Sequence, residues 1–220
     1  MLKYRNLVDL QQESCEKFKD LPLYGTKGKN GYEWITYGEF AEKVDSFRAG
    51  LSYIGVKGGD RIAIISKNSW EWAVCAFASW SLNAVFVPMY EKQNLDECGL
   101  ILKDSGTKVL IVASEEIYSR ISRIVSNIPE VERVINIEAP EENELSFKYL
   151  MNYGKSHPAA AVYPDPYDLF SLIYTSGTTG VPKGVMLTHK NVLFNVHSAA
   201  ANYDFRTGYR CLSVLPWAHI

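Results

Sequence analysis

Short apolar runs alternate along the chain with longer stretches in which apolar residues recur every three or four positions. The short runs are rich in valine and isoleucine, a composition typical of strands that are buried on both faces. They lie at Arg61–Ile65, Ala84–Val87, Lys108–Val112 and Arg133–Ile137, and a further short strand is expected at Tyr32–Thr36. Strands that alternate with helices in this way predict an α/β fold, in which helices cover both faces of a parallel sheet.

The helical stretches begin with recognisable capping residues. Thr36 is followed three positions later by Glu39, which is the pattern of a capping box. A first helix is expected over Asp9–Lys19 and a last one over Thr188–Tyr203. The predicted N-terminal caps are Thr36, Asn68, Asn94, Ser114 and Thr188.

The stretch from Trp72 to Tyr90 contains no charged residue and reaches the length of a membrane-spanning helix. Serine, asparagine and proline residues interrupt it, and its pattern changes near Asn83. We therefore expect a buried helix followed by a buried strand rather than a membrane span. Peripheral contact with a membrane stays compatible with this pattern.

The alternation of strands and helices weakens between residues 138 and 168. Glutamates at positions 141, 142 and 144 predict a solvated acidic loop rather than a metal site. Prolines at positions 158, 164 and 166 predict an extended, stiff approach to the next strand. A subdomain boundary is expected within residues 138–168, and a final strand is expected over Arg210–Leu215.

Composition narrows the class of protein. The 220 residues carry a net charge of −2, with 47% hydrophobic and 22% charged residues, which is typical of a globular protein and argues against general nucleic-acid affinity. The four cysteines are far apart in the sequence, so we expect reduced thiols, a cytoplasmic protein and no bound metal. An anionic ligand would need a local positive field, for which Lys183, His189 and Lys190 are the candidates.

The densest candidate chemistry lies in the segment Tyr174–Val185. Apolar runs at Leu169–Tyr174 and Val185–Leu187 predict two short strands that hold this segment as a loop. Its glycines, at positions 177, 180 and 184, allow a close approach of backbone to ligand, and its four hydroxyl side chains can donate to phosphate oxygens. Lys183 adds a positive charge that Pro182 restrains. The pattern therefore predicts a polyphosphate-binding loop.

Two other phosphate-binding patterns fit this segment poorly. A Walker A loop requires Ser or Thr after Gly-Lys, whereas Lys183 lies between Pro182 and Gly184. The G-x-G-x-x-G fingerprint is also absent, because Gly177 and Gly180 supply only one of its two spacings. On composition alone, a Gly/Thr hairpin turn without a ligand stays open as an alternative.

The order of residues in this segment resembles the signature loop of the adenylate-forming, or AMP-binding, superfamily over all twelve positions. The segments Met186–Asn191 and Val87–Tyr90, and a Leu-Pro-x-x-His pattern at 215–219, are similar to long-chain fatty-acyl-CoA synthetases. The resemblance implies an enzyme that uses ATP, Mg²⁺ and CoA to convert a fatty acid into its CoA thioester through an acyl-adenylate. It gives catalytic roles to Lys183 and His219 and assigns no metal ligand within the chain. It gives nucleotide binding to Thr175, Ser176, Gly177, Thr178, Thr179, Gly180, Pro182 and Lys183.

Enzymes of this superfamily continue for several hundred residues beyond the position that resembles Ile220. The resemblance therefore implies that residues 1–220 form an incomplete N-terminal part of the AMP-binding domain of an acyl-CoA synthetase-like fold, inactive by itself. Residues for adenine, for Mg²⁺ and for most of an acyl tunnel are expected beyond Ile220. Two other functions stay open: a different adenylate-forming enzyme, such as an aryl-CoA ligase or a peptide-synthetase adenylation domain, and a non-catalytic nucleotide-binding module.

Overall fold

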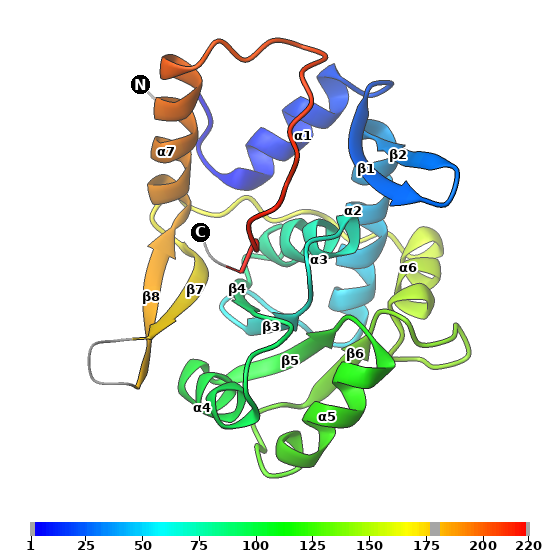
Figure 1. Cartoon of the computed structure of the whole chain (residues 1–220), viewed down its shortest axis with the longest axis vertical. Helices are drawn as coiled ribbons and strands as arrows, with labels where there is room; N and C mark the ends of the chain where they lie inside the picture. The colour runs from blue at the N-terminus through cyan, green and yellow to red at the C-terminus, as the bar shows by residue number, and fades with distance from the viewer. Residues whose placement is uncertain (1–2, 177–180, 219–220) are drawn as a thin grey trace.

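A six-stranded sheet forms the centre of the computed structural model, which describes residues 3–176 and 181–218 (Figure 1). Its strands are β3 (Arg61–Ile65), β4 (Val85–Met89), β5 (Thr107–Val112), β6 (Arg133–Asn136), β7 (Leu169–Ser176) and β8 (Pro182–Thr188). They lie in the order β6-β5-β3-β4-β7-β8. The strands β3 to β7 are parallel, whereas β8 returns antiparallel to β7. The α/β fold expected from the sequence is confirmed, with one antiparallel strand at the edge.

Helices cover both faces of this sheet. They are α1 (Leu7–Lys17), α2 (Tyr37–Tyr53), α3 (Trp70–Trp80), α4 (Leu95–Ser105), α5 (Glu115–Val125), α6 (Phe147–Ser156) and α7 (His189–Asn202). On β3, Ile62 and Ile64 pack into a core with α1, α2, α3 and α6, whereas Ala63 and Ile65 pack against α4 and α5. Figure 1 shows α4 and α5 on one side of the sheet and α2 and α3 on the other. Strands covered in this way are apolar on both faces, which explains their continuous apolar runs.

Most of the predicted helix starts are confirmed. The Thr36 backbone N–H donates to Glu39 Oε2 at 2.7 Å and the Glu39 N–H donates to Thr36 Oγ1 at 3.1 Å, which closes the capping box of α2. The side chains of Asn94, Ser114 and Thr188 likewise cap α4, α5 and α7. The prediction for α3 is wrong by one residue, because Ser69 and not Asn68 accepts from the Trp72 N–H, at 3.2 Å.

Two parts of the fold were not predicted. The first is β1 (Pro22–Gly28), which pairs antiparallel with β2 (Gly31–Thr36) in a separate hairpin whose strands carry no alternation of buried and exposed residues. Its partner β2 confirms the strand expected at Tyr32–Thr36. The helix α6 lies in the region where the predicted alternation weakened, and it packs directly on α2. The two helices touch so closely that a Cβ placed on Gly154 would lie 1.9 Å from the Ser46 carbonyl oxygen.

The uncharged stretch 72–90 begins inside α3, continues to the end of that helix and then forms β4, as expected. Both elements are buried for most of their length. No helix in residues 3–176 and 181–218 is long and apolar enough to cross a membrane.

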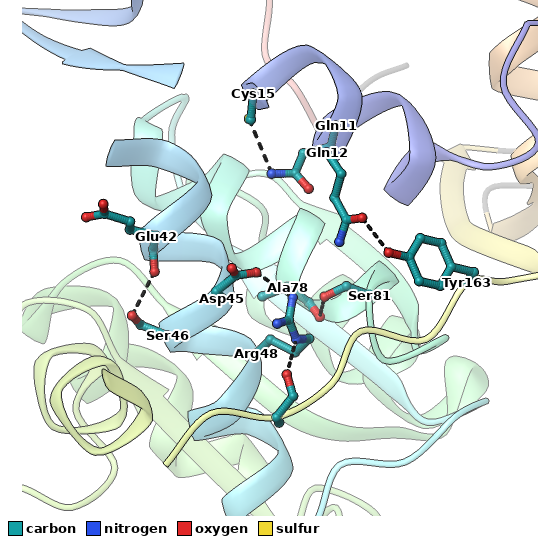
Figure 2. A network of polar contacts seen from close by, with 11 residues as sticks. Gln11, Gln12, Cys15, Glu42, Asp45, Ser46, Arg48, Ala78, Ser81 and Tyr163 are labelled. Atoms are coloured by element: carbon teal, nitrogen blue, oxygen red, sulfur yellow. Dashed lines mark hydrogen bonds and ion pairs between the residues drawn. The ribbon is translucent and has the colours of Figure 1, made fainter. Parts of the chain in front are cut away.

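The segment 157–168 lies against the helices as it returns the chain to the sheet. Arg48 on α2 donates through Nε to the Ala159 carbonyl oxygen at 2.9 Å and also pairs with Asp45 (Figure 2). The Val162 N–H donates to the Ser81 carbonyl oxygen at 2.8 Å. These contacts hold the extended chain that leads into β7.

β7 joins the parallel sheet at a short stretch near its start. Ser171 pairs with Phe86 on β4 and donates through Oγ to the Phe86 carbonyl oxygen at 2.8 Å. Trp80 Nε1 donates to the Phe170 carbonyl oxygen at 2.8 Å. From Leu172 to Ser176 the ladder of β7 continues with β8 alone.

The strand expected over Arg210–Leu215 is not formed, and this prediction is wrong. Residues 204–216 follow an irregular path from the end of α7 toward α3, drawn in red tones in Figure 1. In the described part of the chain no strand lies beside them to pair with their backbone, and their apolar side chains stay exposed, with Leu212 80% and Leu215 77% accessible. To form a strand, an apolar run needs a neighbouring strand to pair with as well as the right composition.

Candidate functional site

The predicted loop is shorter than expected, because both flanking strands extend into it. Tyr174 pairs with Gly184, Thr175 with Lys183, and Ser176 with Pro182. The polar segment is therefore the end of a β-hairpin whose strands are paired as far as Ser176 and Pro182. Four of the predicted nucleotide-binding residues, Gly177, Thr178, Thr179 and Gly180, lie outside the described residues.

Tyr174 anchors the hairpin to α4. Its hydroxyl donates to Asp104 Oδ2 at 2.6 Å. Burial, followed by the hydrogen bond to Asp104, raises the pKa of Tyr174 above its ordinary value, so the hydroxyl keeps its proton at neutral pH. The ring lies over Gly184, where a Cβ would come within 3.0 Å of Tyr174 Cζ. The absence of a side chain at Gly184 therefore leaves room for this ring.

Lys183 and Thr175 occupy opposed positions of the hairpin. Directly paired residues of antiparallel strands point to the same face, so these two side chains project together on the face opposite Tyr174. Both are exposed, and Lys183 makes no hydrogen bond or ion pair with the described residues. Its ammonium group is available to an anion.

The other two cations proposed for the local field behave differently. His189 is 1% exposed, and its Nδ1 accepts a hydrogen bond from the Leu7 N–H at 3.3 Å. Burial lowers the pKa of His189 to about 4, although nearby Asp168 opposes the shift, so the ring is neutral at pH 7. The expectation that His189 supplies positive charge is therefore wrong. Lys190 donates through Nζ to the Tyr167 hydroxyl at 2.7 Å and lies over the Tyr167 ring.

The buried imidazole makes stability depend on pH. Because the pKa of His189 is about 4 in the folded chain and 6.5 in its ordinary range, the unfolded chain binds the extra proton between these values. The stabilisation is fully present above pH 6.5 and is lost as pH falls toward 4, by up to about 3 kcal/mol. Thermal unfolding of His189→Asn, which keeps an acceptor but does not titrate, should lose less stability over this range than the wild type. Equal pH slopes would contradict this assignment.

The second predicted motif, Leu-Pro-x-x-His at 215–219, is held by Asn68. Asn68 Oδ1 accepts from the Trp217 N–H at 2.8 Å, and Nδ2 donates to the Leu215 carbonyl oxygen at 2.7 Å. The Trp217 ring packs edge-on against Trp72, with centroids 5.4 Å apart. His219, the predicted catalytic histidine, lies outside the described residues.

An open apolar groove lies between this motif and the core. The volume of this groove is about 520 Å³. One wall is formed by residues 212–217, and the other by aromatic side chains of α3 and β7. Its lining residues are Leu7, Trp72, Phe77, Trp80, Phe170, Val192, Leu212, Ser213, Val214, Leu215, Pro216 and Trp217. The groove suits an apolar ligand, because Ser213 is the one side chain in this set with a hydroxyl group.

A family model described as "AMP-binding enzyme" matches residues 11–220. The chain belongs to the AMP-binding enzyme family. The match covers the whole β7–β8 hairpin, which contains the segment that resembles the signature loop.

Relatives within the AMP-binding family include acyl-CoA ligases. The peroxisomal long chain acyl-CoA synthetase 6 of Arabidopsis thaliana is 30% identical over 97% of this chain and 33% of its own length. The long-chain-fatty-acid–CoA ligase FadD15 of Mycobacterium tuberculosis is 33% identical over 84% of this chain and 32% of its own length. The chain thus spans about a third of the length of these curated relatives.

Solved structures of AMP-binding enzymes share the fold. The N-terminal domain of FACL13 from Mycobacterium tuberculosis, solved with an inhibitor, superposes with a TM-score of 0.82 at 27% identity, covering 98% of this chain and 52% of that one. The anthranilate CoA ligase AuaEII, solved with anthranoyl-AMP, superposes with a TM-score of 0.78 at 25% identity, covering 92% of this chain and 37% of that one.

Within the described residues, the structure brings together only four of the predicted site residues. Thr175, Ser176, Pro182 and Lys183 lie at the end of one hairpin. Two supporting residues were missed: Asp104, which holds Tyr174, and Asn68, which holds the segment 213–217. No local pattern marks Asp104, whereas the sequence predicts Asn68 as a helix cap and the structure places it on the segment 213–217 instead.

Proposed function

We propose that this chain is part of an ATP-dependent acid–thiol ligase that activates a fatty acid and transfers it to CoA. In the first step a carboxylate oxygen attacks the α-phosphorus of ATP, the bond to the β-phosphate oxygen breaks, and pyrophosphate leaves. In the second step the CoA sulfur attacks the acyl carbon, the thiol proton is released, and AMP leaves. The activity is proposed for the complete protein, because the chain spans about a third of its curated relatives.

The observation that carries this proposal is the exposed pairing of Lys183 with Thr175 at the end of the β7–β8 hairpin. Both reactants of the first step are anions, so catalysis must neutralise negative charge as the leaving pyrophosphate develops it. Lys183 would bind the β- and γ-phosphates as a point charge. Hydroxyl and backbone N–H groups from Thr175 to Gly180 would donate to the phosphate oxygens, and Pro182 would restrain the returning strand.

Mg²⁺ is expected as a companion of ATP in this reaction. Among the described residues, no three His, Cys, Asp or Glu side chains are grouped to hold a metal ion. Residues that serve Mg²⁺ are expected beyond Ile220, and the roles proposed for this chain are those of Lys183 and the hydroxyl donors. His219 would follow the segment that Asn68 holds and is proposed to act near the reacting carboxylate.

Two observations support a fatty acid as the substrate. The printed names of the curated relatives include long-chain acyl-CoA synthetases. The groove of about 520 Å³ beside the Leu-Pro-x-x-His motif is lined almost entirely by apolar side chains. An aryl acid is the second candidate, because the anthranilate CoA ligase shares the fold at 25% identity.

Carboxylate-dependent exchange between ATP and pyrophosphate in the complete protein tests the proposal. Palmitate and oleate should give a kcat/KM at least about tenfold above that of benzoate, since each buried methylene contributes about 0.8 kcal/mol. Benzoate or anthranilate as the best substrate would favour the aryl-CoA ligase. Absence of exchange with every acid, while nucleotide binding persists, would favour a non-catalytic nucleotide-binding module.

A further inference from the structure

The Asn68 carboxamide joins the loop between β3 and α3 to a segment far along the sequence. Its Nδ2 donates to the Leu215 carbonyl oxygen at 2.7 Å and to Ser213 Oγ at 3.1 Å. Its Oδ1 accepts from the Trp217 N–H at 2.8 Å. One side-chain amide thus binds a carbonyl group and an N–H group two residues apart, as the backbone of a neighbouring strand would.

These bonds are the main polar attachment of the segment 211–218. Within the described residues, no backbone–backbone hydrogen bond joins this segment to the rest of the chain, and no side chain other than Asn68 reaches it from outside with a hydrogen bond. The remaining bond is internal, from Trp217 Nε1 to Ser213 Oγ at 2.7 Å. The Trp217 ring supplies the apolar attachment through Trp72 and Tyr24, at centroid distances of 5.4 Å and 5.9 Å.

The segment that Asn68 holds is also one wall of the apolar groove. Residues 212–217 face the opposite wall, which includes Trp72, Trp80 and Phe170. These three aromatic side chains are fixed in the core, since each is less than 10% exposed. Asn68 does not line the groove. The distance between the walls therefore depends on the bonds that Asn68 makes with the segment 212–217 and on the contact of Trp217 with Trp72.

We propose that Asn68 is a positioning residue that fixes this wall and thereby sets the affinity for the apolar chain of the carboxylate substrate. The inference rests on the proposed function, because it takes an apolar acid as the occupant of the groove. Asn68 acts through Leu215 and Trp217 and does not touch the substrate. An amide is required, because the site needs one donor and one acceptor on the same side chain.

The test compares Asn68→Ala and Asn68→Asp with the wild type in the complete protein. For Asn68→Ala, the KM for palmitate in ATP–pyrophosphate exchange should rise by about tenfold, because the variant loses two to three hydrogen bonds that are partly exposed to water. The KM for ATP should change by less than about twofold, because the phosphate-binding hairpin is untouched. Asn68→Asp keeps the acceptor for the Trp217 N–H but loses the donor to Leu215 and Ser213. Its KM for palmitate should therefore lie between those of the wild type and Asn68→Ala.

A direct measure of the wall accompanies the kinetics. Hydrogen exchange of the peptide 212–218 should be faster in Asn68→Ala than in the wild type, because the Trp217 N–H loses its acceptor. Ser69→Ala is the matched control: it removes the cap of α3 at the adjacent position without touching the segment. It should lower the melting temperature and leave both the ratio of the two KM values and the exchange of 212–218 unchanged.

An unchanged palmitate KM in Asn68→Ala, equal rises in both KM values, or unchanged hydrogen exchange would overturn the inference. If Asn68→Ala does not fold, Ser213→Ala on the exposed segment provides the second test, and it should raise the palmitate KM in the same direction. A wild-type protein without exchange for any acid would defeat the proposed function itself, a result independent of Asn68, and the inference would fall with it.

Discussion

Replacing Lys183 with alanine in the complete protein is expected to reduce carboxylate-dependent ATP–pyrophosphate exchange by a factor of some hundreds. A donor aimed at charge that develops in the transition state commonly contributes about 3 kcal/mol. Lys183 lies exposed on β8 and makes no ion pair with the described residues, so its charge is not committed to the fold. The free energy of unfolding should therefore change by less than about 0.5 kcal/mol, and the melting temperature should stay close to that of the wild type.

Lys27 provides a matched control for this variant. It is an exposed lysine on β1, and Figure 1 shows the β1–β2 hairpin on the opposite side of the molecule from the β7–β8 hairpin. Lys27→Ala removes the same charge from the same kind of position and should leave exchange unaltered. If Lys183→Ala exchanged pyrophosphate as fast as Lys27→Ala, Lys183 would have no part in the mechanism.

Gly154→Ala is expected to give the largest loss of stability. A Cβ at this position would lie 1.9 Å from the Ser46 carbonyl oxygen and 3.1 Å from the Ala49 Cβ, so α6 would have to move away from α2. Overpacking of this kind costs about 3 kcal/mol. For a chain of this size that corresponds to a fall in melting temperature of about 6–12 °C.

Gly99→Ala tests whether the effect comes from the close contact rather than from the helix. Gly99 lies inside α4, and the nearest atom to a Cβ placed there is Ile124 Cδ1 at 3.8 Å. The same substitution should therefore raise stability by about 0.5–1 kcal/mol, because alanine favours a helix interior over glycine. A loss of similar size in both variants, measured by thermal or urea unfolding, would refute the role of the contact between α2 and α6.

The parallel sheet and its helix starts could be predicted because their signals are local. A cap such as Thr36 binds a backbone group three residues away, so the pattern and its partner lie in the same short stretch. The strands β3 and β5 are buried on both faces and show this in continuous apolar runs. The helix α6 also carries a local signal, Ser146 before Phe147, although the alternation of strands and helices weakens in this region of the sequence.

The rest of the site depends on contacts between distant residues. Asn68 has the right residue type for a helix cap, yet its partners are 145 to 149 positions away. His189 follows the signature loop in sequence, but Leu7, 182 positions away, and Phe170 surround its ring and keep it neutral. Burial and pairing of this kind arise only when the whole chain has folded, so sequence patterns could not distinguish these residues from an ordinary cap and an ordinary surface cation.

The hairpin of β7 and β8 pairs with the parallel sheet at Ser171, and from Leu172 to Ser176 the ladder of β7 continues with β8 alone. The middle of that stretch is still held by the molecule, because Ile173 is 3% exposed and Leu172 and Tyr174 pack against the core that includes α4. The Tyr174–Asp104 hydrogen bond adds a polar tie to α4 at the same place. The positions of Thr175, which follows this tie, and of Lys183, which pairs with Thr175, are therefore set by the core of the domain and not by the hairpin alone.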